Sequence, residues 1–151
     1  MNALVVYDSL YGNTEKIARA VGEALGPGTR VVRAGGVDPA DLETVDLLVV
    51  GSPTHGGRPT EAVQELLERL EGSLPAGARV AAFDTRMGAK WVGIFGYAAG
   101  KIARVLEKAG GTLVAPAEGF VVRGKEGPLK DGERERATNW AKELAGSGSR
   151  E

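Results

Sequence analysis

The sequence contains no cysteine, which excludes disulfides, thiolate catalysis and cysteine-ligated zinc or iron–sulfur centres. It contains one histidine, His55, so a metal site or an acid–base site that needs two histidines is not expected. The formal net charge of −1 gives no overall attraction to nucleic acid or to an anionic membrane surface. Function must therefore be sought in local motifs.

Long apolar runs are also missing. No run approaches the roughly 20 residues of a membrane span, and the amino terminus lacks the basic segment and apolar stretch of a signal peptide. We therefore expect a cytoplasmic protein. A length of 151 residues, 42% of them hydrophobic and 26% charged, predicts one globular domain over residues 1–145 and a flexible C-terminal tail at residues 146–151.

Short apolar runs alternate with segments of helical periodicity. Strands are predicted at residues 3–7, 30–34, 47–50, 79–83 and 112–115, the last resuming at 119–122, and helices at about 14–25, 60–70, 97–109 and 133–144. This alternation predicts an α/β fold, a doubly wound five-stranded parallel sheet with helices on both faces. Ligands of such sheets bind at the carboxyl ends of the strands, so the loops after strands one, three and four are the candidates for function.

The loop after the first strand has the features of an anion site. It contains Ser9, Leu10, Tyr11, Gly12, Asn13 and Thr14 and leads to the amino end of a helix, where unpaired N–H groups and the positive dipole end attract anions. Side chains of Ser9, Asn13 and Thr14 can add donors. The loop has no lysine or arginine and lacks the Walker and dinucleotide-binding glycine motifs, so it would hold phosphate by neutral donors. A simple helix cap and turn is the alternative.

This loop resembles the phosphate loop of the flavodoxin family, Ser/Thr-x-Thr-Gly-Asn-Thr, and the resemblance covers nearly the whole chain. Tyr11 replaces the usual threonine, as in the flavodoxin domains of flavo-diiron proteins and related quinone reductases. The resemblance implies a short-chain flavodoxin-like fold with strand order 2-1-3-4-5 and FMN as cofactor. It also implies a monomer or weak dimer that exchanges electrons with a reductase and an acceptor.

The resemblance places two further loops around the flavin. The loop after the third strand would contribute Pro53, Thr54, His55, Gly56 and Gly57 and lie along the ring, where a peptide near Gly56 could flip to accept a hydrogen bond from reduced flavin N5. Without a flavin, the same loop is a turn with a surface histidine. The loop after the fourth strand would contribute Asp84, Thr85, Arg86, Gly88 and Trp91.

Trp91 is the expected stacking partner of the ring, with Tyr97 behind it, although a place in the core would suit Trp91 equally. Arg86 and Lys90 make this loop basic, where an ordinary flavodoxin tends to be acidic. A cation near flavin N1 would favour the anionic reduced flavin, so we expect a higher second reduction potential than in an ordinary flavodoxin.

Three functions remain open from the sequence. The first is an FMN-dependent electron carrier, the second an FMN-dependent reductase of a quinone or other small molecule, and the third a flavodoxin-fold binding or regulatory module without flavin. A phosphoacceptor receiver domain shares the fold plan and has an acidic residue at Asp8, but Gly51-Ser52-Pro53 provides no phosphoacceptor aspartate after the third strand. We therefore reject the receiver domain.

Overall fold

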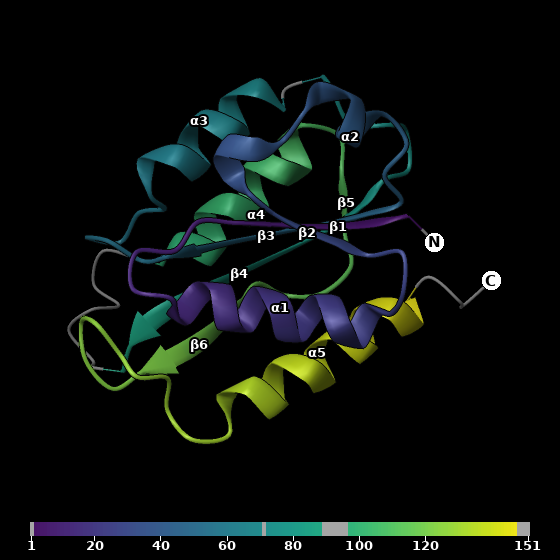
Figure 1. Cartoon of the computed structure of the whole chain (residues 1–151). Helices are drawn as coiled ribbons and strands as arrows, with labels where there is room; N and C mark the ends of the chain where they lie inside the picture. Colours follow the sequence, from purple (N-terminus) through teal and green to yellow (C-terminus); the bar gives the residue numbers. More distant parts are fainter. Residues whose placement is uncertain (1, 71, 89–96, 148–151) are drawn as a thin grey trace.

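The computed structural model describes residues 2–70, 72–88 and 97–147. Its sheet contains β1 (Ala3–Tyr7), β2 (Arg30–Arg33), β3 (Leu47–Pro53), β4 (Arg79–Met87), β5 (Thr112–Leu113) and β6 (Glu118–Val122). The helices are α1 (Asn13–Leu25), α2 (Pro39–Glu43), α3 (Glu61–Arg69), α4 (Ala98–Lys108) and α5 (Glu133–Ser147). All strands pair in parallel in the order β2-β1-β3-β4-β5, and β6 also pairs with β4, which confirms the predicted fold class and strand order (Figure 1).

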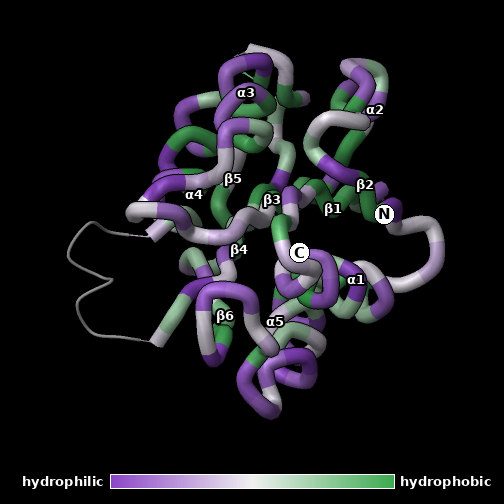
Figure 2. Tube along the Cα trace, turned by 60° about the vertical axis from the view of Figure 1, so that its left-hand side comes forward, coloured by the Kyte–Doolittle hydropathy of each residue, from purple (hydrophilic) through white to green (hydrophobic). Residues whose placement is uncertain are grey.

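Side chains that alternate along the strands build two cores, one on each face of the sheet. On β1, Leu4 and Val6 pack with α2, α3 and α4, whereas Val5 packs with α1 and α5. Val63, Leu66 and Leu67 of α3 and Leu70, which directly follows it, are all buried. Apolar residues concentrate along the central strands β1 and β3, and α1 and α5 cover the opposite face from α3 and α4 (Figures 1 and 2).

The fourth strand is longer than predicted. The sequence analysis ended it at Phe83 and placed Asp84 at the start of a glycine-rich loop, but β4 runs on to Met87. Asp84 and Thr85 pair with the end of β3, and Arg86 and Met87 pair with β6. The prediction was wrong because a charged residue after an apolar run normally marks a strand end, whereas here tertiary contacts satisfy the charge of Asp84.

The last strand is interrupted, as the resumption at 119–122 suggested. Residues 114–117 separate β5 from β6. On β4, only Ala81 and Ala82 lie between the residues that pair with β5 and those that pair with β6. The short helices Ala34–Gly36 and α2 were not predicted, because neither is long enough to show a helical period. The C-terminal helix extends to Ser147, past its predicted end at Leu144, and the remainder of the predicted tail lies outside the described residues.

Three aromatic rings pack the middle of β4 against β6 and α5. Phe83, Phe120 and Trp140 form three edge-to-face pairs, each with 6.0 Å between ring centroids. Gly51 on the neighbouring strand makes room for them, because a Cβ there would lie 2.0 Å from the Phe83 ring. This packing holds the carboxyl edge of the sheet, where the predicted loops emerge. None of the helices in the described part of the chain is long and apolar enough to span a membrane.

Candidate functional site

A cleft of about 140 Å³ lies at the carboxyl edge of the sheet, where the predicted loops meet. Eleven of the predicted site residues line it: Ser9, Leu10, Tyr11, Asn13, Thr14, Pro53, Thr54, His55, Gly56, Thr85 and Arg86. Three further residues, Met87, Val122 and Lys125, complete the lining. The fold therefore brings together the loops after β1, β3 and β6 and the ends of β4 and β6 in one concave site.

The amino end of α1 opens into this cleft without a side-chain cap. Gly12 adopts a left-handed conformation (φ 90°, ψ −6°), which a residue with a Cβ adopts only with strain, and its N–H donates to Ser9 Oγ at 3.0 Å. The backbone N–H groups of Asn13, Thr14 and Glu15 donate to no residue that the structure describes. Three donors at the positive end of a helix are thus available to an anion.

The polar side chains of the loop at residues 9–14 differ in what they contact. The Asn13 amide was expected to donate to a phosphate, but its Nδ2 donates to the Glu126 carbonyl at 3.2 Å and so joins two loops. Thr14 Oγ1 lies 2.8 Å from Thr85 Oγ1, and both residues are buried beside the cleft. One hydroxyl of this pair donates to the other, so the second keeps its hydrogen for a further acceptor.

The loop after β3 forms a tight hairpin turn. His55 and Arg58 exchange two backbone hydrogen bonds of 2.8 and 2.9 Å, and the two residues between them, Gly56 and Gly57, have φ values of 54° and 79°. Positive φ at both central positions defines a type I′ turn, which glycine adopts without strain. His55 and Gly56 are exposed and line the cleft, whereas Gly57 is buried and does not.

Asp84 lies in the interior and not on the cleft surface. It is 0% exposed, and its carboxylate accepts hydrogen bonds from Arg86 Nε at 2.7 Å, Arg86 Nη2 at 2.8 Å and the Ala99 backbone N–H at 2.9 Å. Thr54 Oγ1 accepts the neighbouring N–H of Ala98 at 3.1 Å, so the two side chains together cap α4. Asp84 was predicted to contact a cofactor; its oxygens are bonded to protein groups and it does not line the cleft, so its role in cofactor binding stays a prediction.

Arg86 lines the cleft, but its guanidinium forms an ion pair with Asp84. Besides the paired contact with Asp84, its guanidinium lies 3.5 Å from the centroid of the Tyr97 ring and against Gly119. The sequence analysis treated Arg86 as an uncompensated cation and Tyr97 as a second ring partner for a flavin. In the structure these two residues bind each other and link β4 to the start of α4.

Two predicted site residues of the loop after β4 remain, Gly88 and Trp91. Gly88 is exposed just beyond β4 and does not line the cleft. Trp91, the expected stacking residue, lies outside the described residues, as does Lys90.

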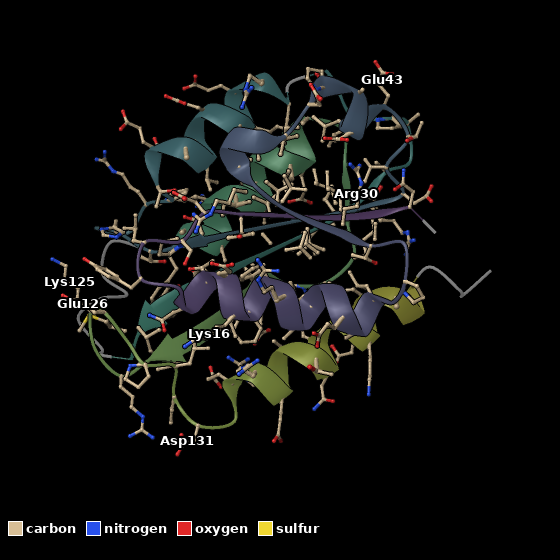
Figure 3. The ribbon with its side chains drawn as sticks, viewed as in Figure 1. Lys16, Arg30, Glu43, Lys125, Glu126 and Asp131 are labelled. Carbon is tan, nitrogen blue, oxygen red and sulfur yellow. The ribbon has the colours of Figure 1, made fainter. Side chains whose placement is uncertain are left out.

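Sequence reasoning missed Met87, Val122 and Lys125. The loop at residues 124–132 was not among the three candidate loops, yet it leaves β6 at the same edge as they do. Its position after a parallel strand was the signal that could have identified it. In Figure 3, Lys125 and Glu126 lie at that edge, beyond the ends of β4 and β6.

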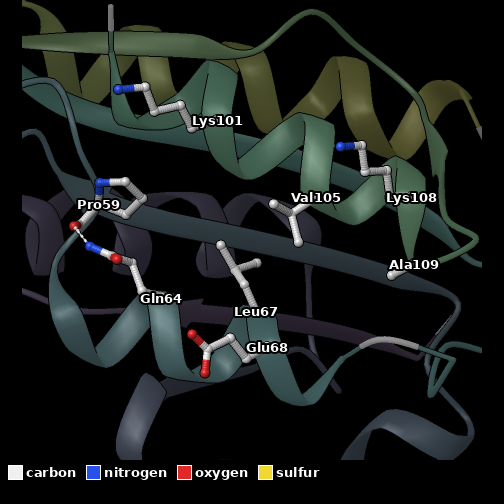
Figure 4. A pocket seen from close by; sticks show the side chains of 8 residues that line it. All are labelled: Pro59, Gln64, Leu67, Glu68, Lys101, Val105, Lys108 and Ala109. Atoms are coloured by element: carbon white, nitrogen blue, oxygen red, sulfur yellow. Dashed lines mark hydrogen bonds between the residues drawn. The ribbon is translucent and has the colours of Figure 1, made fainter. Parts of the chain in front are cut away.

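A second and larger hollow lies elsewhere, in the groove between α3 and α4. Its volume is about 440 Å³, and it is lined by Pro59, Gln64, Leu67, Glu68, Lys101, Val105, Lys108 and Ala109 (Figure 4). Gln64 Nε2 donates to the Pro59 carbonyl at 2.8 Å at one end. No predicted site residue borders this groove, and the described residues contain no group of three or more acidic or histidine side chains able to hold a metal ion.

Comparisons with known proteins give the family and the fold. The model of the flavodoxin family matches residues 5–140. A comparison with curated protein sequences found no match. Among solved structures, the chain is similar to a flavodoxin from the domain Archaea, with a TM-score of 0.81, 22% identity and 97% of each chain covered.

Two other solved structures extend this picture. Oxidised Flavodoxin 2 from Bacillus cereus has a TM-score of 0.81 and 25% identity over 97% of this chain and 99% of its own. The rubredoxin oxygen:oxidoreductase of Desulfovibrio gigas has a TM-score of 0.77 and 21% identity, and this chain covers 36% of it. The same fold thus occurs both as a separate protein and as part of a larger one.

Proposed function

This chain belongs to the flavodoxin family, whose members bind flavin and transfer electrons, and we propose that it binds FMN in the carboxyl-edge cleft and carries electrons between redox partner proteins. FMN would supply an isoalloxazine ring that accepts and releases electrons one or two at a time. The protein's own part is to hold the phosphate, to position the ring and to control its surroundings.

One observation carries the proposal: the uncapped amino end of α1 opens into the cleft that the other loops enclose. The unpaired N–H groups of Asn13, Thr14 and Glu15 suit a phosphate, and the hydroxyls of Ser9 and Thr14 can add donors. A phosphate at this helix end would set the ring beside the loops after β3 and β4.

The rim of the cleft suits a planar ring. Leu10 and Tyr11 are the large apolar side chains that the described part of the chain exposes, at 51% and 46%, and both border the cleft. A flavin ring would cover such surface, and the face of Tyr11 suits stacking. Opposite them, the turn at Gly56 and Gly57 has little side-chain bulk, so backbone groups can approach the ring closely.

The carrier role is favoured over a reductase by the small size of the site. In the described part of the chain, the cleft of about 140 Å³ is open and shares its lining with no second hollow that could hold a substrate. An exposed ring edge suits electron exchange with a protein partner that docks briefly, whereas a reductase also needs a pocket for its substrate.

The test is a visible spectrum of the purified chain before and after adding FMN, followed by stepwise anaerobic reduction. Flavin bands that shift on binding, with two electrons taken up in separate steps, are the expected result. Rapid reduction of bound FMN by NAD(P)H alone would instead support the reductase. Absence of FMN binding would overturn the proposal in favour of a flavin-free module.

A further inference from the structure

The charge balance around the amino end of α1 leaves a bound phosphate without a cation from its own loop. A phosphate monoester carries between one and two negative charges at neutral pH. The loop at residues 9–14 contains no lysine or arginine, and Asp8 and Glu15 flank it. Neutral donors can hold the phosphate, but a cation that balances its charge would have to come from outside this loop.

Arg33 at the end of β2 is one candidate, but its guanidinium already pairs with the carboxylates of Asp8 and Glu15. Its guanidinium lies 3.6 Å from Asp8 Oδ1 and 3.5 Å from Glu15 Oε1, and Arg19 lies 2.7 Å from the other oxygen of Glu15. These two arginines and two carboxylates balance. Arg33 also donates to the Ser9 carbonyl at 3.3 Å, so it supports the loop rather than offering surplus charge.

Lys125 lines the same cleft from the loop after β6, and this loop is held against the start of α1. The Glu126 carbonyl accepts the Asn13 amide at 3.2 Å. Gly127, with φ 103°, approaches Asn13 so closely that a Cβ would lie 2.7 Å from its side chain. The same contact brings Lys125 to the cleft.

The surroundings of Lys125 suit a ligand cation. It lines the cleft together with Ser9, Asn13 and Thr14, whereas its neighbour Glu126 does not line it. Among the residues described, no carboxylate forms an ion pair with Lys125. Figure 3 shows the two side chains at the edge of the sheet.

We propose that Lys125 supplies the positive charge that the phosphate loop lacks and thereby makes the site select phosphorylated flavin over riboflavin. This inference rests on the proposed binding of FMN. It assigns a role to a residue 111 positions from Thr14 in the sequence, and that role depends on the bond between Asn13 and Glu126.

The experiment titrates the flavin-free chain with FMN and, separately, with riboflavin, and compares Lys125→Gln with Lys142→Gln. Lys142 is an exposed lysine on α5 outside the cleft, so its loss makes the same change in net charge. We expect Lys125→Gln to raise the Kd for FMN about tenfold, which corresponds to about 1.4 kcal/mol. The Kd for riboflavin should stay the same, and Lys125→Arg should retain most of the FMN affinity.

Salt provides a second readout. Raising the ionic strength should weaken FMN binding to the unaltered chain more than to Lys125→Gln, because screening acts on the charge pair that the variant lacks. The inference is overturned if Lys125→Gln leaves the Kd for FMN within twofold of the unaltered chain, or weakens both flavins equally. If the unaltered chain binds neither flavin, the proposed function itself fails and this inference fails with it.

Discussion

Thr14 and Thr85, 71 positions apart in the sequence, share a hydrogen bond of 2.8 Å between their hydroxyl oxygens. Thr14 is 1% exposed and Thr85 4%, and both border the cleft. The bond joins the first turn of α1 to the end of β4, so it sets the distance between the loop proposed to hold the phosphate and the strand end beside the ring. Its loss should therefore affect stability and binding together.

Replacing Thr85 with valine should lower the free energy of unfolding by about 1 kcal/mol, because a buried hydroxyl on Thr14 loses its partner. Urea denaturation measures the change, and Thr85→Ser is the control because it keeps the hydroxyl. A Thr85→Val variant as stable as the unaltered chain would show that this hydrogen bond contributes nothing to stability.

Gly51 is expected to tolerate no side chain. A Cβ would lie 2.0 Å from the Phe83 ring, which two edge-to-face contacts hold in place, so Gly51→Ala should cost about 1–3 kcal/mol or more. Gly100 on α4 is the matched control, since a Cβ there has nothing within 4 Å and its φ is ordinary. Gly100→Ala should be stabilising by roughly 0.5–1 kcal/mol. Thermal unfolding measures both changes. Equal shifts in the melting temperatures of the two variants would contradict this reasoning.

Glu133 should contribute to the acid sensitivity of the fold. The Arg136 guanidinium beside it holds the pKa of its carboxyl below the usual 4.5, and the Val121 N–H, which donates to the same carboxylate, acts in the same direction. Because the folded-state pKa is the lower one, this stabilisation is complete above the unfolded pKa. It is lost as the pH falls through the folded pKa.

Glu133→Gln should therefore lower the free energy of unfolding by about 1 kcal/mol at pH 7 and flatten its decline below pH 4.5. Urea midpoints measured from pH 7 to pH 3 test this expectation. Glu143→Gln, an exposed position on the same helix, is the control and should follow the unaltered chain. Parallel curves for Glu133→Gln and the unaltered chain would contradict the assignment.

Two aspartate–arginine pairs differ in burial, so they test whether burial determines how much such a pair contributes to the free energy of unfolding. Asp84 is 0% exposed beside Arg86, whereas Asp131 is 95% exposed and 3.0 Å from Arg123. Asp84→Ala should cost about 3–5 kcal/mol, because Arg86 loses its partner and α4 loses a cap. Asp131→Ala should cost less than about 1 kcal/mol.

Denaturant unfolding of both variants gives the comparison. If Asp84→Ala does not fold, Arg86→Lys retains the charge but not the two-point contact and should show a smaller, measurable loss. Similar costs at the buried and exposed aspartates would contradict the account.

Much of the architecture follows from local pattern. The continuous run Leu47–Val50 is typical of a strand covered on both faces, and all four residues are 0% exposed. The inward stripe of α3 follows from its 3.6-residue period. The end of β4 did not follow from pattern, because the compatibility of Asp84 with a strand depends on Arg86 and on the start of α4.

The candidate site shows the same division at the level of single residues. The motif at residues 9–14 indicated an anion site at the start of α1, because the unpaired donors of a helix end are a property of the backbone itself. The protein contacts of Asn13 and Arg86 could not be predicted from local sequence. Each has polar groups that suit a ligand, and only the fold supplies the neighbours, Glu126 and Asp84, to which they also bond.

By itself, then, the sequence determined the alternation of strands and helices, the burial of the central strands and the three loops that meet at one edge, because periodicity and chain order dictate them. Only the tertiary structure decided which side chains face the cleft. The bond between Asn13 and Glu126 brings Lys125 to the cleft, and the pair of Asp84 and Arg86 withdraws a carboxylate from it. Such choices depend on distances between residues far apart in the chain, which no local pattern encodes.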